Sequence, residues 1–213
     1  IYLQKFLEII DKFQPGTIQS YFDKDWFVYA AVPYVIKPYE NIVKTPKDTI
    51  SFDAEWDKNI KEKRESLGAD GALLRSIDDA IYHVNLIEKL LATLLSKLSN
   101  FIPEGGIWLN TQRPEWNDAN NALVGYGLSV VTLGYLRRFV TFFQSLIKDQ
   151  TNEISLHSEV AGLLRNIGVV LQNFHSNLDE EFTPESRLEM MNYLGKAGSD
   201  YRLGIYESGF SGS

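Results

Sequence analysis

The sequence predicts a mainly α-helical protein of antiparallel helical hairpins, with a small extended or β segment near residues 20–50. Apolar residues recur at three- and four-residue spacing over long stretches, and short breaks separate these stretches. Residues 20–50 instead place β-branched and aromatic side chains between Pro33, Pro38 and Pro46, which is typical of short strands. We expect residues 1–213 to form a single mainly helical domain. Because the chain begins and ends within helical patterns, we expect a fragment of a longer protein.

The elements of the N-terminal half follow from these patterns. Apolar residues from Tyr2 to Phe13 form one helical stripe, which a Pro-Gly pair ends. Residues 53–67 are predominantly charged and predict a solvated surface helix. Residues 73–98 carry the strongest periodicity, and they predict an amphipathic helix about seven turns long.

The C-terminal half predicts three more helices. Residues 128–147 are apolar on nearly every side, which favours a central, buried helix. Residues 156–178 show a second amphipathic pattern. The last helix is expected to begin at Thr183 as N-cap, with Pro184 at its first position. We see no sequence repeat, so a regular short-repeat solenoid is not favoured.

Composition excludes several function classes. The net charge of -7 argues against binding to a nucleic-acid backbone, and it is compatible with a neutral ligand such as a sugar. The chain has no Cys and only 3 His, without an HExxH or HxxxH pattern, so we expect neither a metal site nor a cofactor. No apolar stretch reaches the roughly 18 residues of a membrane span.

The most informative segment is the loop EGGIWLNTQRPEWNDANN, which starts at Glu104 and precedes an apolar helix. Core packing does not require this collection of polar and aromatic groups. The candidate site residues are Trp108, Asn110, Arg113, Glu115, Trp116, Asn117, Asp118, Asn120 and Asn121. Taken singly, each has a structural interpretation: Asp118 or Asn117 can cap a helix, and either Trp can anchor a core.

Together these residues predict a site for a polar ligand with aromatic walls. The flat faces of Trp stack on sugar rings, while Asn, Arg and Asp side chains hydrogen-bond to hydroxyls. A carboxyl group beside a Trp is partly desolvated, which raises its pKa and suits a general acid. Gly125 and Gly127 interrupt an otherwise good helical pattern, and they predict close approach of another backbone or of a ligand.

The run EWNDANNALVGYGLS resembles the DWND-type active-site loop of the (α/α)6-barrel sugar phosphorylases that act on cellobiose and chitobiose. More broadly, it resembles six-hairpin glycosidases. The resemblance covers roughly fifteen residues and implies an (α/α) toroid, or part of one, that cleaves glycosidic bonds as a hydrolase or phosphorylase. Glu115 then corresponds to the first acid of DWND and to the proton donor. Trp116, Asn117 and Asp118 line the sugar subsite, with Asp118 as the alternative acid.

The sequence departs from that pattern, because Glu115 replaces Asp and the continuation ANNALVG differs. It also leaves the second catalytic group open. Glycosidases use a second carboxylate, about 5–5.5 Å or roughly 6.5–9.5 Å away, whereas phosphorylases need a basic pocket for phosphate. Asp78 and Asp79, on the expected long helix, are candidates for the second acid, and Glu207 is another.

Two alternatives remain for the chain as a whole. It is part of a twelve-helix toroid, or a smaller helical domain with a related loop. The expected partners are an oligosaccharide or glycoside substrate and the remaining domains of a longer parent protein. The alternative function is non-catalytic: sugar binding or protein interaction by a helical domain within a larger protein.

Overall fold

The structure is a computed structural model of the whole chain, and it describes residues 1–76, 78–111 and 122–210. Its helices there are α1 (Tyr2–Phe13), α2 (Tyr39–Lys44), α3 (Ala54–Leu67), α4 (Leu86–Leu98), α6 (Val130–Ile147), α7 (Ser158–Asn173) and α8 (Pro184–Ser208). Its strands are β1 (Phe27–Val28), β2 (Tyr34–Ile36), β3 (Ile50–Phe52), β4 (His83–Val84), β5 (Phe101–Ile102), β6 (Gly106–Trp108) and β7 (Leu128–Ser129). The predicted mainly helical class is confirmed.

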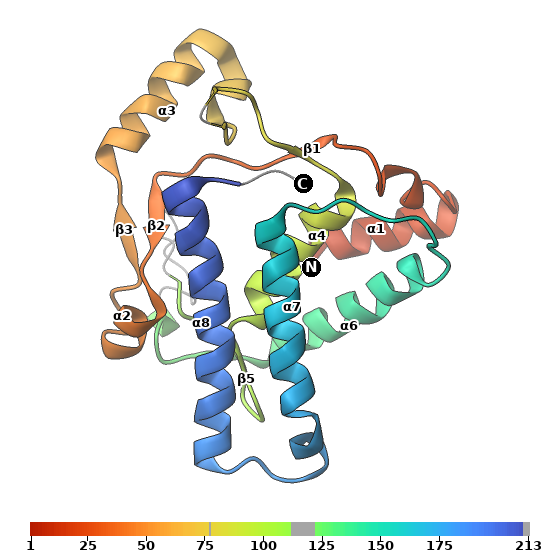
Figure 1. Cartoon of the computed structure of the whole chain (residues 1–213), viewed down its shortest axis with the longest axis vertical. Helices are drawn as coiled ribbons and strands as arrows, with labels where there is room; N and C mark the ends of the chain where they lie inside the picture. Colours follow the sequence, from red (N-terminus) through yellow and green to blue (C-terminus); the bar gives the residue numbers. More distant parts are fainter. Residues whose placement is uncertain (77, 112–121, 211–213) are drawn as a thin grey trace.

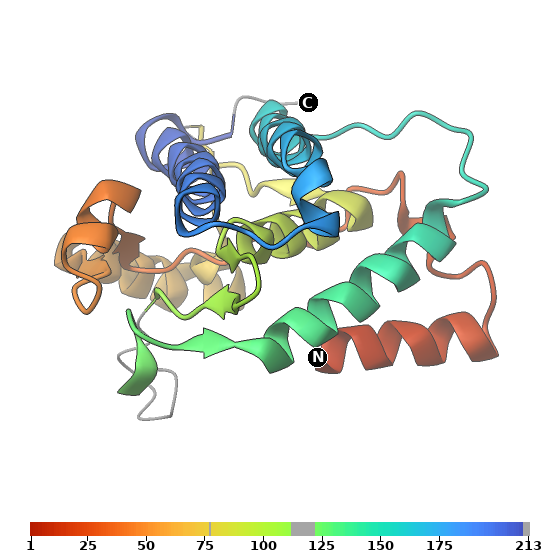
Figure 2. The same ribbon diagram turned by 90° about the horizontal axis from the view of Figure 1, so that it is seen from below.

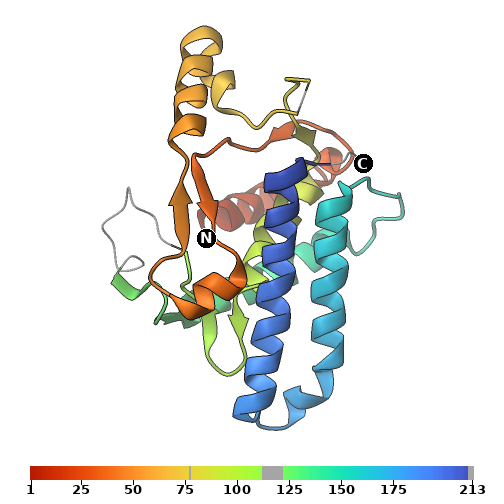
Figure 3. The same cartoon turned by 60° about the vertical axis from the view of Figure 1, so that its left-hand side comes forward.

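The helices lie in three layers, which Figure 2 shows edge-on. The antiparallel pair α7 and α8 forms one outer layer, and the two helices lie side by side in Figures 1 and 3. Helix α4 runs through the middle, and α1 and α6 form the other outer layer. The described residues do not establish the predicted (α/α) toroid, which stays a prediction.

The central helix is α4 and not the segment 128–147, so the prediction for that segment is wrong. Helix α4 is buried over most of its length, with Leu90 and Leu95 each only 1% exposed. Helix α6 buries only Leu136, Phe143 and Leu146. Its apolar composition therefore does not reflect a position inside the core, because an outer helix can also carry exposed apolar side chains.

The helix predicted for residues 73–98 is half as long as expected. It begins only at Leu86, where the Asn85 side chain caps it by accepting a hydrogen bond from the Glu88 N–H (2.9 Å). Before it, β4 pairs with β1, and an isolated bridge joins Arg75 to Ile81. Strand pairing with a distant segment thus overrides the local helical pattern.

The predicted extended segment is confirmed in part. Strands β2 and β3 pair antiparallel, with Tyr34 opposite Phe52 and Ile36 opposite Ile50. Between them lies the short helix α2, which the pattern did not predict. A third sheet joins β5, β6 and β7. In Figure 3 its β5–β6 hairpin lies beside α8, and this sheet carries the start of the candidate loop.

The predicted start of the last helix is confirmed. Thr183 caps α8 by accepting a hydrogen bond from the Ser186 N–H (3.1 Å), with Pro184 in the first turn. Arg138 of α6 reaches an acid on a neighbouring helix, donating from Nε to Glu8 Oε1 of α1 (2.8 Å). This hydrogen bond lowers the pKa of the Glu8 carboxyl. Within the described ranges, no helix is both long and apolar enough to cross a membrane.

Candidate functional site

A polar pocket of about 370 Å³ lies where the candidate loop begins. Its wall combines one indole, two amides, three hydroxyls and two cations from four parts of the chain. These side chains are Trp108, Asn100, Asn110, Ser96, Thr111, Thr132, Lys97 and Arg202. They come from the end of α4, the segment around β6, the first turn of α6, and α8. The volume lies within the range of small-molecule sites.

Trp108 is fixed in orientation at the end of β6. Its indole N–H donates to the carbonyl of Gly125 (3.1 Å), and its backbone N–H donates to the carbonyl of Asn100 (2.8 Å). The ring is only partly buried and lines the pocket. Because the N–H already has a protein partner, the indole has mainly its apolar surface to offer a ligand.

Asn110 is 6% exposed and joins the loop to the end of α4. Its Nδ2 donates to Asn100 Oδ1 (2.8 Å), while its Oδ1 accepts from the Thr111 hydroxyl (3.2 Å). Asn100 in turn donates to the carbonyl of Ser96 (3.2 Å). Each Asn amide group has two N–H donors. The network therefore fixes both amides at the pocket wall and still leaves each with donor capacity.

The predicted close approach at Gly125 is confirmed, and the neighbour is a backbone. Gly125 has φ +83°, and a Cβ built on it would lie 2.3 Å from the carbonyl oxygen of Pro46. Pro46 lies in the turn before β3, so Gly125 lets the end of the candidate loop pack against a distant segment. Only Gly adopts this conformation without strain and leaves this space.

We therefore expect Gly125→Ala to lower the free energy of unfolding by about 2 kcal/mol, the middle of the range for overpacking. Chemical denaturation would measure the loss. Gly134→Ala in α6 is the matched control, because a Cβ there meets nothing within 4 Å. That variant is expected to gain about 0.5–1 kcal/mol from the better helix propensity of Ala. Equal stability of the two variants would contradict the packing at Gly125.

Two cationic side chains lie among the described lining residues of the pocket, although the whole chain is acidic. They are Lys97 and Arg202, and none of the described lining residues is an Asp or Glu. Arg202 is largely buried, and this desolvation lowers the pKa of its guanidinium. Its Nε–H is buried and donates to no acceptor in the described structure. The sequence pattern of α8 did not single out Arg202, because one Arg in a mixed helix gives no local signal.

Most of the predicted site lies outside the described residues. Arg113, Glu115, Trp116, Asn117, Asp118, Asn120 and Asn121 all fall in 112–121. The assignments of the proton donor and of most of the subsite therefore stay predictions. Trp108 and Asn110 are described, and both line the polar pocket as a ligand-binding role requires.

The candidates for a second acid are not brought to this pocket. Asp78 and Asp79 lie in an exposed turn and not on a helix, which corrects the sequence expectation. Asp79 has φ 64° and forms ion pairs with Lys63 and Arg75. Glu207 is exposed near the end of α8. None of these three carboxyl groups lines the polar pocket.

Sequence reasoning missed a buried polar cluster centred on Glu88, which is 1% exposed within α4. Glu88 Oε2 accepts from the backbone N–H of His157 (2.8 Å), and Glu88 Oε1 lies 2.9 Å from His157 Nδ1. The Tyr29 hydroxyl donates to Oε1 (3.2 Å). The sequence contained one signal for this cluster, which was a Glu within the mostly apolar segment 86–95. Because Glu88 is enclosed, it serves the fold and does not contact a ligand.

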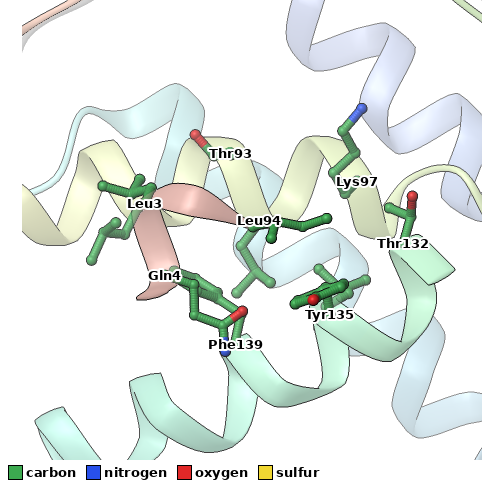
Figure 4. A pocket seen from close by; sticks show the side chains of 11 residues that line it. Leu3, Gln4, Thr93, Leu94, Lys97, Thr132, Tyr135 and Phe139 are labelled. Carbon is green, nitrogen blue, oxygen red and sulfur yellow. The ribbon is translucent and has the colours of Figure 1, made fainter. Parts of the chain in front are cut away.

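An apolar pocket of about 210 Å³ adjoins the polar one between α1, α4 and α6 (Figure 4). Leu3, Leu94, Tyr135 and Phe139 are among its lining residues, and Lys97 and Thr132 line both pockets. Figure 4 shows the ammonium end of Lys97 pointing away from Leu94 and Phe139. Groups that need hydrogen bonds therefore fit the polar pocket and not this one.

Within the described parts of the chain, no three or more His, Asp and Glu side chains are grouped so as to hold a metal ion. No protein-family model matches the chain, and no curated protein is detectably similar to it. The pocket and the sequence of the loop are therefore the features that indicate a function.

Proposed function

We propose that this chain is a carbohydrate-active enzyme domain that cleaves glycosidic bonds, as a hydrolase or phosphorylase. The observation that carries this proposal is the polar pocket at the start of the candidate loop. It presents the Trp108 indole beside the amides of Asn100 and Asn110, the combination that binds a sugar ring and its hydroxyls. Glu115 is the proposed proton donor, and Asp118 is the alternative.

The remaining loop residues complete the proposed sugar subsite. Arg113, Trp116 and Asn117, with Asn120 and Asn121, supply a further indole and further hydrogen-bonding groups in the sequence. Lys97 and Arg202 make part of the pocket basic, which a phosphorylase would need and a hydrolase would not. The proposal leaves these two reactions open.

A sugar-binding measurement tests the pocket independently of catalysis. We expect cellobiose to bind, and Trp108→Ala to weaken its Kd about tenfold, equivalent to ~1.4 kcal/mol. Trp108→Phe is expected to retain most of the affinity, because it keeps an aromatic face. Isothermal titration calorimetry would give the constants, with circular dichroism to confirm folding.

Trp26→Ala is the matched control, because Trp26 is 65% exposed and lies outside the pocket. It should bind cellobiose as the wild type does. An unchanged Kd in folded Trp108→Ala would contradict the proposed site. Failure of cellobiose and of a wider panel of neutral and acidic sugars to bind the wild type would contradict the function itself.

A second candidate function is sugar binding without catalysis. The indole of Trp108 and the amides of Asn100 and Asn110 support it, because these groups bind a sugar without taking part in catalysis. A wild-type protein that binds glycosides and turns none over would support this alternative over the enzyme.

A further inference from the structure

We infer that the polar pocket selects sugars that carry an anionic group, a carboxylate or a phosphate ester, and that Arg202 is its counter-charge. This inference rests on the proposed function, and it specifies the substrate class of the same site. The whole chain, with a net charge of -7, gives no indication of it. The indication comes from the local charge of the pocket.

Arg202 lies in the last third of α8, and its side chain lies back along the helix. A Cβ built on Gly198 would lie 3.3 Å from Arg202 Nη1, so the guanidinium lies against a residue that has no side chain to displace it. This placement holds the guanidinium at the pocket wall, between α8 and the end of α4.

A buried Arg normally pairs with a carboxylate, because an uncompensated charge is costly to remove from water. The described structure contains no ion pair to Arg202, and its buried Nε–H donates to nothing. Within the described structure, the groups beside its guanidinium are the hydroxyls of Tyr201 and Tyr206, and neither is a carboxylate.

The planar guanidinium of Arg202 offers paired N–H donors that match the two oxygens of a carboxylate or phosphate. Asn100, Asn110 and Trp108 supply neutral hydrogen bonds and an apolar face beside the guanidinium. The pocket therefore has separate groups for an anion and for a sugar ring.

The test compares matched sugars that differ in one charged group. Glucose and galactose are titrated beside glucuronate, galacturonate and glucose 6-phosphate, and inorganic phosphate is titrated alone. We expect an acidic member to bind at least tenfold more tightly than its neutral counterpart. In Arg202→Gln that preference should fall to about twofold or less. Arg202→Lys should keep part of it.

Arg187→Gln is the control on the same helix, because Arg187 pairs with Glu104 outside the pocket and should not affect the preference. The Tm of Arg202→Met tests, without any ligand, whether the guanidinium has a partner inside the protein. If the guanidinium has no internal partner, Arg202→Met should leave the Tm unchanged or raise it. A large fall in Tm would show a structural ion pair and overturn the inference.

The other outcomes are equally decisive. Equal affinity for acidic and neutral sugars would overturn this inference and leave the proposed function standing. A preference that persists in folded Arg202→Gln would remove Arg202 from the role. Binding of inorganic phosphate through Arg202, with no preference among the sugars, would assign the charge to free phosphate instead. If no sugar binds, the proposed function fails and the inference fails with it.

Discussion

Glu115→Gln is expected to lower the turnover of unactivated glycosides such as cellobiose by about 10²–10⁴-fold, the usual contribution of a positioned general acid. The amide keeps the shape of the side chain but cannot donate a proton to the leaving oxygen. A glycoside with a highly acidic leaving group, such as a dinitrophenyl glycoside, needs little protonation and should lose far less. Initial-rate measurements on both substrates would show this difference.

Asp118→Asn is the matched variant, because Asp118 is the alternative acid three residues away. If Glu115 is the donor, Asp118→Asn should lower both rates by similar factors, through weaker binding. The reverse pattern would assign the proton donor to Asp118. Full activity of Glu115→Gln on cellobiose would exclude Glu115 from the role. Circular dichroism spectra like that of the wild type would show that the variants are folded.

The sequence predicted elements correctly where one local signal dominates. Helix α1 follows its apolar stripe, and α8 begins where Thr183 and Pro184 mark its start. Gly125 also gives a local signal, because a Gly inside a helical pattern indicates that another group approaches the backbone closely. In each case, the conformation is decided within a few residues of the signal.

Prediction failed where a distant segment decides the outcome. Residues 73–85 have a helical pattern, yet pairing of β4 with β1 holds part of them extended. Apolar content also placed the wrong helix at the centre, because it cannot distinguish an exposed apolar face from a buried one. Arg202 illustrates the same limit at the pocket. Arg202 and the start of the loop line the same pocket, although about ninety positions separate them in the sequence. Only the tertiary fold brings them together.

Glu88→Ala is expected to lower the free energy of unfolding by about 3–5 kcal/mol, the cost of removing one member of a buried charged or hydrogen-bonded pair. Glu88 is the acceptor shared by the His157 N–H and the Tyr29 hydroxyl, and it lies within hydrogen-bonding distance of the His157 ring. These contacts join α4 to the start of α7 and to the segment after β1. Their loss would leave several buried polar groups without partners.

Three variants separate the contribution of the Glu88 charge to the free energy of unfolding from that of its shape. Glu88→Gln keeps an oxygen that can accept the His157 N–H, so it should lose about 1–3 kcal/mol. Glu62→Ala removes an exposed acid whose nearest cation is Lys58 at 3.7 Å, and it should change stability by less than about 1 kcal/mol. Chemical denaturation with a constant m-value would rank them. A loss below 1 kcal/mol in Glu88→Ala would show that this cluster does not hold α4 against α7. Since small domains are stable by only about 5–15 kcal/mol, the expected loss is a large fraction of the stability of the protein.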